Sequence, residues 1–150
     1  MEFKYISKKI DDTLNLAANI ESEKFSNMVI CLDGELGSGK TIFVKGFAKA
    51  LGIHENITSP TFNIIKEYYE GEMPLFHMDV YRLDENNDDI GVTEYFLKNG
   101  VTIIEWSDLI KNDLPSERLD IIIKIVDENT RVFILKPYGK VYEDLCETVI

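Results

Sequence analysis

Residues 34–41 read GELGSGKT, which fits the pattern G-x-x-x-x-G-K-[ST] of a phosphate-binding loop. An apolar run of strand length, Met28–Leu32, precedes this stretch, and a helical pattern from Ile42 to Leu51 follows it and stops at Gly52. Strand, glycine-rich loop and helix in this order are the context in which backbone N–H groups wrap a phosphate chain. The alternative interpretation is a glycine turn that joins a strand to a helix and holds no ligand.

The residue types of this loop predict how it would hold a nucleotide. Lys40 would reach the β- and γ-phosphates, and the hydroxyl of Thr41 would ligate Mg²⁺. The predicted nucleotide-binding stretch is Glu35, Leu36, Gly37, Ser38, Gly39, Lys40, Thr41 and Ile42.

Length and composition predict one globular P-loop domain over residues 1–150, of which 45% are hydrophobic and 29% charged. With 16 basic and 27 acidic residues the net charge is −11, so the general field of the protein repels nucleic acid. Cys31 and Cys146 have neither metal-ligand spacing nor the pattern of a disulfide framework. No signal-like or membrane-spanning apolar run is present, and we therefore expect a cytoplasmic protein without a membrane association.

Strand and helix patterns before and after the loop predict an α/β protein. A short strand is expected at Glu2–Ile6, followed by a helix capped by Ser7, with Asp11 and Asp12 in its first turn. Further strands are expected at Thr61–Tyr69, Leu75–Leu83, Val101–Ile104, Ile121–Val126 and Arg131–Leu135, and further helices at Gly91–Asn99 and Val141–Thr148.

These elements predict a P-loop NTPase-like mixed sheet with flanking helices. Its parallel strands would carry the nucleotide loop at their C-terminal ends, where ligands collect in such folds. The strands at 61–69 and 75–83, and those at 121–126 and 131–135, would form antiparallel hairpins that extend the sheet. The acidic segment 84–89 reads as a solvated loop.

A phosphate loop needs a second Mg²⁺ carboxylate, normally at the end of a neighbouring strand. Glu105 follows the buried-strand run Val101–Ile104 and is the candidate for that position. The alternative is a surface carboxylate that caps the next helix, a task for which Ser107 and Asp108 are also suited.

Two further stretches hold candidate functional residues. Thr61 in the sequence SPTF stands where phosphate-loop proteins keep a threonine that senses the γ-phosphate. In the run His77–Arg82, strand alternation places His77, Asp79 and Tyr81 on one face, and a carboxylate there could order the attacking water. A polar, exposed sheet face is the alternative for this run.

The stretches GELGSGKT, SPTF, HMDVYR and IEW, in this order and spacing, resemble the TsaE (YjeE) family of small bacterial ATPases. The resemblance extends from the N-terminal helix to about Leu114. Two positions depart from the family pattern: Ile42 stands where a second threonine is frequent, and Ser107 where a proline often follows Glu-Trp.

This resemblance implies a protein that binds ATP and Mg²⁺ and hydrolyses ATP slowly. It implies partners, the TsaD and TsaB proteins, in a complex that installs threonylcarbamoyl on the adenosine of tRNA next to the anticodon. The tRNA would be reached only through those partners. The implied functional positions are Lys40, Asp79 and Glu105 for catalysis, Thr41 and Glu105 for the metal, and Thr61 and Trp106 beside the nucleotide.

Two other functional classes fit a phosphate-binding loop. A small-molecule kinase of the P-loop class is the runner-up, but the segment 84–98 contains no arginine and many carboxylates, which suits a lid over a triphosphate poorly. A GTP-driven switch normally reads guanine with Asn-Lys-x-Asp, which this sequence lacks. No basic residue is placed as an arginine finger, since Arg82 falls opposite Asp79 by strand parity, and this predicts weak turnover without partners.

Overall fold

A computed structural model describes residues 1–60, 65–81 and 91–150. In chain order the elements are β1 (Phe3–Ser7), α1 (Ile10–Ser22), β2 (Val29–Gly34), α2 (Lys40–Leu51), β3 (Ile65–Tyr68), β4 (Leu75–Asp79), α3 (Val92–Tyr95), β5 (Val101–Glu105), the 3₁₀ segment η1 (Ser107–Asp113), β6 (Arg118–Ile125), β7 (Arg131–Tyr138) and α4 (Lys140–Val149). The predicted Thr61, Arg82 and the acidic segment 84–89 lie outside the described residues.

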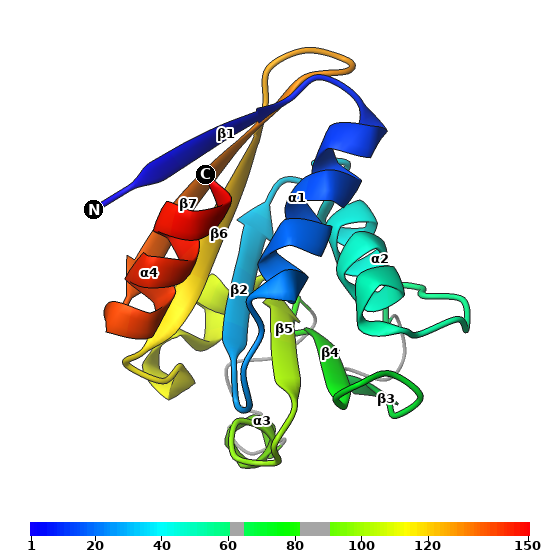
Figure 1. The fold of residues 1–150 in the computed structure, drawn as a ribbon, viewed down its shortest axis with the longest axis vertical. Helices are drawn as coiled ribbons and strands as arrows, with labels where there is room; N and C mark the ends of the chain where they lie inside the picture. The colour runs from blue at the N-terminus through cyan, green and yellow to red at the C-terminus, as the bar shows by residue number, and fades with distance from the viewer. Residues whose placement is uncertain (61–64, 82–90) are drawn as a thin grey trace.

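The strands form one seven-stranded mixed sheet in the order β1-β7-β6-β2-β5-β4-β3 (Figure 1). The central strand β2 runs parallel to both β5 and β6, and β4 runs parallel to β5. Antiparallel hairpins extend both sides of this centre, β3–β4 on one side and β6–β7 on the other, with β1 added antiparallel to β7. The predicted α/β class and mixed sheet are therefore confirmed.

Helices α1, α2 and α4 lie on one face of the sheet (Figure 1). Successive side chains of β2 point to opposite faces of the sheet, and both faces are buried. Ile30 and Leu32 point toward these helices, whereas Val29 and Cys31 join the apolar cluster on the opposite face. Strands buried on both sides read as continuous apolar runs, as residues 28–32 do.

Three sequence expectations fail at element ends. Ser7 does not cap α1: it ends β1, its hydroxyl donates to the Lys9 carbonyl at 2.9 Å, and Lys9 is the N-cap residue. The strand expected to run on past Asp79 ends there, since the Asp79 carboxylate accepts the Tyr81 N–H at 3.0 Å and turns the chain. The helix expected over 91–99 is only Val92–Tyr95.

That helix is short because the residues after Tyr95 form hydrogen-bonded turns and do not continue the α-helix. The N–H groups of Phe96, Leu97 and Lys98 each bond three residues back, and Asn99 adopts a φ of 62° before the chain enters β5. In contrast, β7 continues three residues beyond the expected Leu135, and Pro137 is accommodated where β7 has β6 but not β1 beside it.

Among the described residues, no helix combines the length and the apolar character that crossing a membrane requires.

Candidate functional site

The glycine-rich loop joins the end of β2 to the start of α2, as predicted. Gly39 immediately precedes α2 with φ 105°, a backbone conformation that side chains oppose. Gly34 is required for a different reason, because a Cβ there would lie 2.6 Å from the Ser38 Oγ and 2.9 Å from the Ile123 carbonyl oxygen. The loop therefore packs directly on Ile123 of β6, and its shape is set by tertiary contact as well as by its glycines.

Lys40 lies at the first position of α2 with only 6% of its surface exposed. Its Nζ donates to the carbonyl oxygens of Gly34, at 2.5 Å, and Glu35, at 3.2 Å, and lies 4.3 Å from the ring centroid of Trp106. Burial lowers the pKa of Lys40, while the charges of Glu105, Asp79 and Asp33 oppose that shift. The ammonium is thus held at the loop by carbonyl groups, an aromatic face and three nearby carboxylates.

Asp79 and Glu105 end the neighbouring parallel strands β4 and β5 and are paired in register. Asp79 accepts hydrogen bonds from the Ser59 hydroxyl, at 3.2 Å, and from the Tyr81 N–H. Glu105 is 3% exposed, and its Oε2 lies 2.5 Å from the Nε2 of His77. The alternatives of an exposed sheet face at His77 and of a surface position for Glu105 are therefore excluded, because both side chains are buried.

Trp106 turns the chain out of β5. Its φ of 61° is unusual for a bulky residue, and its ring packs against Tyr81 with centroids 4.8 Å apart. The Trp106 N–H donates to the Leu32 carbonyl at 3.0 Å, which ties this turn to the end of β2. The indole is thereby placed beside Lys40, as a neighbour of the glycine-rich loop.

One hollow of about 350 Å³ collects most of the predicted site residues. It is lined by Leu36, Gly37, Gly39, Lys40, Thr41, Ile42, Ser59, Asp79, Glu105 and Trp106. Of the other predicted residues, Glu35 contributes its carbonyl to Lys40, and Ser38 is buried behind the loop. Ser59 was not among the predicted site residues, although it belongs to the stretch SPTF.

A second hollow, of about 180 Å³, lies on the other side of the same loop. It shares Gly37, Gly39 and Ile42 with the first hollow and is otherwise lined by Ser7, Lys9, Ile10, Thr13, Ser38, Glu128, Asn129 and Arg131. Sequence reasoning missed this side entirely. It is formed by the start of α1 and the β6–β7 turn. No local sequence pattern predicts that these two segments contact the loop.

Arg131 is the residue that links the β6–β7 turn to the loop. Its Nη2 donates to the Gly37 carbonyl at 3.2 Å, and its Nη1 donates to carbonyls of its own turn, including that of Asp127 at 2.7 Å. The guanidinium therefore lies on the side of the loop away from Glu105, between the turn and the glycines.

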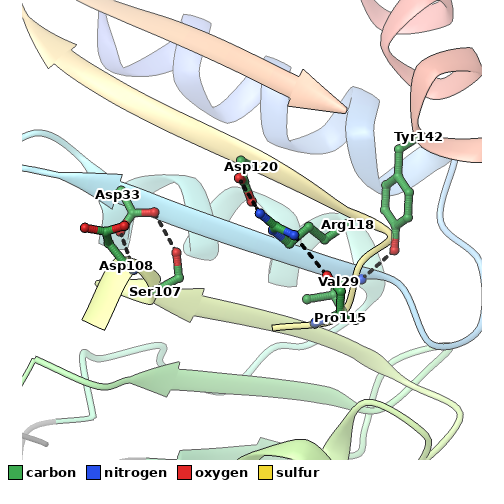
Figure 2. A network of polar contacts seen from close by, with 8 residues as sticks. All are labelled: Val29, Asp33, Ser107, Asp108, Pro115, Arg118, Asp120 and Tyr142. Carbon is green, nitrogen blue, oxygen red and sulfur yellow. Dashed lines mark hydrogen bonds and ion pairs between the residues drawn. The ribbon is translucent and has the colours of Figure 1, made fainter. Parts of the chain in front are cut away.

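On the opposite face of the sheet, Asp33 binds the segment after Trp106 (Figure 2). The Ser107 hydroxyl donates to Asp33 Oδ2 at 2.6 Å, and the Asp108 N–H donates to Oδ1 at 3.3 Å. Burial raises the pKa of Asp33, and the Ser107 hydrogen bond partly offsets this. Ser107 and Asp108 therefore do not cap η1 with their side chains, as the sequence had suggested, but join the ends of β2 and β5.

Comparison with known proteins identifies close relatives over most of the chain. Residues 7–133 match the family model described as "Threonylcarbamoyl adenosine biosynthesis protein TsaE". A protein of Bacillus subtilis (strain 168), described as tRNA threonylcarbamoyladenosine biosynthesis protein TsaE, is 50% identical over 119 residues, which are 79% of this chain and 75% of that protein. A protein of Treponema pallidum with the same description is 38% identical, over 84% of this chain and 94% of its own.

The fold is also found in a solved structure. The crystal structure of YdiB from Bacillus subtilis aligns with a TM-score of 0.88 and 40% sequence identity, and the alignment covers 99% of this chain and 94% of that one.

Proposed function

The chain belongs to the TsaE family, and from this premise we propose that it is a Mg²⁺-dependent ATPase acting in the biosynthesis of threonylcarbamoyladenosine in tRNA. The observation that carries the ATPase proposal is the first hollow, in which Lys40 and Thr41 of the glycine-rich loop face the carboxylates of Asp79 and Glu105. A loop built for phosphate and two strand-end carboxylates in one hollow are the parts that phosphoryl transfer requires.

The site residues fit a bound triphosphate. Gly37 and Gly39 adopt the positive φ values that let a loop turn its N–H groups inward, and they precede the N-terminus of a twelve-residue helix. Within the described part of the chain, the buried Oγ of Ser38 has no hydrogen-bond partner. A buried hydroxyl of this kind is expected to bond a ligand atom or water, so Ser38 supports the assignment.

The two hollows suggest the direction in which ATP lies. They share Gly37, Gly39 and Ile42, so a phosphate chain held by the loop would have one end in each hollow. The γ-phosphate belongs on the side of Asp79 and Glu105, where metal-binding and water-ordering groups gather. The adenosine then belongs in the second hollow, among Ile10, Thr13 and the β6–β7 turn.

Four residues of the first hollow, Lys40, Thr41, Asp79 and Glu105, have a proposed task in hydrolysis. Lys40 exchanges its carbonyl partners for β- and γ-phosphate oxygens, and Thr41 and Glu105 hold the metal ion; a site with few protein ligands completed by phosphate oxygens is usual for Mg²⁺. Bound there, Mg²⁺ would neutralise charge that develops on the phosphate oxygens. Asp79, whose carboxylate accepts hydrogen bonds from the Ser59 hydroxyl and the Tyr81 N–H, would orient the attacking water. The fluorescence of Trp106, which lies beside Lys40, would change on binding.

Slow turnover by the protein alone follows from the charges around this hollow. Lys40 is the only cationic side chain that lines it among the described residues, and Arg131 is engaged on the other side of the loop. Arginine groups that reach the γ-phosphate accelerate phosphoryl transfer greatly. We therefore propose that partner proteins, TsaD and TsaB, activate or use the hydrolysis, and that these partners bind the tRNA which a chain of charge −11 repels.

The proposal is tested by titrating ATP with Mg²⁺ while recording the fluorescence of Trp106, the only tryptophan. The wild type should respond, and Lys40→Ala should lose about 10²–10³ in kcat/KM for ATP hydrolysis, because a charge that compensates the transferred phosphate is gone. Lys45→Ala removes an exposed lysine of the same helix and serves as the matched control. Unchanged hydrolysis by Lys40→Ala would refute the ATPase assignment.

A second assay addresses the pathway. The protein is combined with TsaD and TsaB proteins, with and without ATP and Mg²⁺, and co-purification and threonylcarbamoyl transfer to tRNA are measured. Nucleotide-dependent association and transfer are expected. Transfer that proceeds equally well with the Lys40→Ala variant would separate this protein's ATP use from the pathway.

A further inference from the structure

His77 lies in the middle of β4 and is completely buried. The other histidine, His54, is exposed. An imidazole in a protein interior has lost its contact with water, and this cost needs a compensating interaction. Among the described residues, the ring of His77 makes one polar contact: its Nε2 lies 2.5 Å from the Oε2 of Glu105.

The strand register places His77 next to Glu105, the candidate metal carboxylate, on the side away from the strand end. β4 and β5 are parallel, Asp79 is opposite Glu105, and His77 is two residues before Asp79 on the same face of the sheet. His77 therefore approaches Glu105 from the interior of the sheet, whereas Lys40 and Thr41 approach from the loop. One side of the carboxylate is held and the other side faces the hollow.

The proton arrangement follows from the chemistry of the two groups. An ionised carboxylate only accepts hydrogen bonds, so the ring donates from Nε2. Within the described residues, Nδ1 has no hydrogen-bond partner, which suits an acceptor nitrogen better than a buried donor. Glu105 then has Oε2 occupied by His77 and Oε1 available to a ligand.

We propose that His77 is a positioning residue, which fixes Glu105 so that Oε1 meets the metal ion of the bound nucleotide. This inference rests on the proposed function. A glutamate side chain has three rotatable bonds, and Asp79 beside it is already fixed by two hydrogen bonds. His77 supplies the corresponding restraint for the longer carboxylate, and hydrogen bonds to metal ligands commonly have a large effect on metal affinity.

The test measures the Mg²⁺ concentration that gives half of the Trp106 fluorescence change at fixed ATP, together with ATP binding in a chelator. His77→Leu removes the donor at similar volume and should raise the Mg²⁺ midpoint about 10–100-fold, with little effect on metal-free ATP binding. His77→Gln places an amide donor near the position of Nε2 and should restore the midpoint toward wild type. Met78→Leu, on the opposite face of the same strand, is the control for altered packing.

A double variant tests whether His77 affects Mg²⁺ binding through Glu105. In the Glu105→Gln background, His77→Leu should cause almost no additional rise in the Mg²⁺ midpoint, because the carboxylate it positions is absent. A His77→Leu protein with the wild-type midpoint would overturn the inference, as would an undiminished effect in the Glu105→Gln background. If His77→Leu does not fold, a His77→Gln midpoint as high as that of Glu105→Gln overturns it instead.

The failure of this inference is distinguishable from failure of the proposed function. If Lys40→Ala and Glu105→Gln behave as proposed while His77→Leu does not, the nucleotide site stands and His77 has a structural role. If the wild type shows no Mg²⁺-dependent response to ATP by fluorescence or calorimetry, the proposed function itself fails.

Discussion

Glu105 illustrates how far a single residue can be interpreted from its neighbours in the chain. An apolar run that ends in a carboxylate predicts a strand-end acid, and β5 does end there. The pairing with His77 was beyond that reasoning, because the two residues are 28 positions apart and meet only when β4 and β5 pair. Burial to 3% exposure excludes the surface cap, whereas the role of Glu105 at a metal ion stays a prediction.

At this scale we expect Glu105→Gln to impair Mg²⁺-dependent hydrolysis more than nucleotide binding. The amide keeps the size of the side chain but removes the negative charge that would hold the metal, and loss of at least about tenfold in kcat is expected. Hydrolysis is measured at saturating ATP, and ATP affinity is measured separately by calorimetry. Equal hydrolysis by the variant and the wild type would remove Glu105 from the site.

At the scale of elements, the candidate site is formed by several separate segments that pack around the glycine-rich loop. The loop after β2, the start of α2 and the ends of β4 and β5 contribute to the first hollow, and the start of α1 with the β6–β7 turn completes the second. Arg131 joins that turn to the Gly37 carbonyl of the loop. Asp33, directly before the loop, accepts the hydrogen bond of the Ser107 hydroxyl (Figure 2), so both the loop and the strand end that leads into it are restrained. A loop restrained in this way needs less reorganisation when it binds phosphate.

Arg131→Gln should therefore weaken ATP binding. The lost contact is a partly solvated hydrogen bond from a charged group, so a decrease of about three- to tenfold in affinity is expected, with secondary structure unchanged. Arg118→Gln is the matched control, because Arg118 pairs with Asp120 at 2.8 Å on the opposite face and touches no residue of the loop. Calorimetric titration with ATP measures both, and equal losses in the two variants would count against the role of Arg131.

At the scale of the whole molecule, helices and apolar side chains cover the centre of the sheet, and this burial also determines the chemistry of the two cysteines. Both cysteines are fully buried. Burial raises the pKa of the Cys146 thiol to about 11 and raises the pKa of Cys31 as well. The reactive thiolate is disfavoured in both cases at neutral pH, and its population rises as the pH rises toward the raised pKa.

We accordingly expect neither thiol to react with an aromatic disulfide reagent in the folded protein at about pH 8, where roughly one Cys146 in a thousand would be ionised. Two thiols per chain should react after denaturation. Reaction is followed by absorbance with and without denaturant. A fast reaction of the native protein that is lost in a Cys146→Ser variant would show that α4 opens readily, because Cys146 lies on the buried side of that helix.

The sequence by itself determined the parts of this protein that depend on local spacing. The glycine-rich loop between a strand and a helix, the buried apolar strands and the α/β class all follow from residues close together in the chain, and so does the prediction, still to be tested, that Lys40, Thr41 and Glu105 form the site. The predicted helix cap at Ser7 was wrong, because the Ser7 hydroxyl donates to the Lys9 carbonyl and the Lys8 N–H is bound by Asp12 instead.

Only the tertiary structure decided which distant residues share the site. Strand pairing brought His77 to Glu105, packing of the β6–β7 turn brought Arg131 to Gly37, and the pairing of strand ends brought Ser107 to Asp33. None of these contacts has a sequence signature, because the order of strands in a sheet is set by the burial of whole faces and not by spacing along the chain.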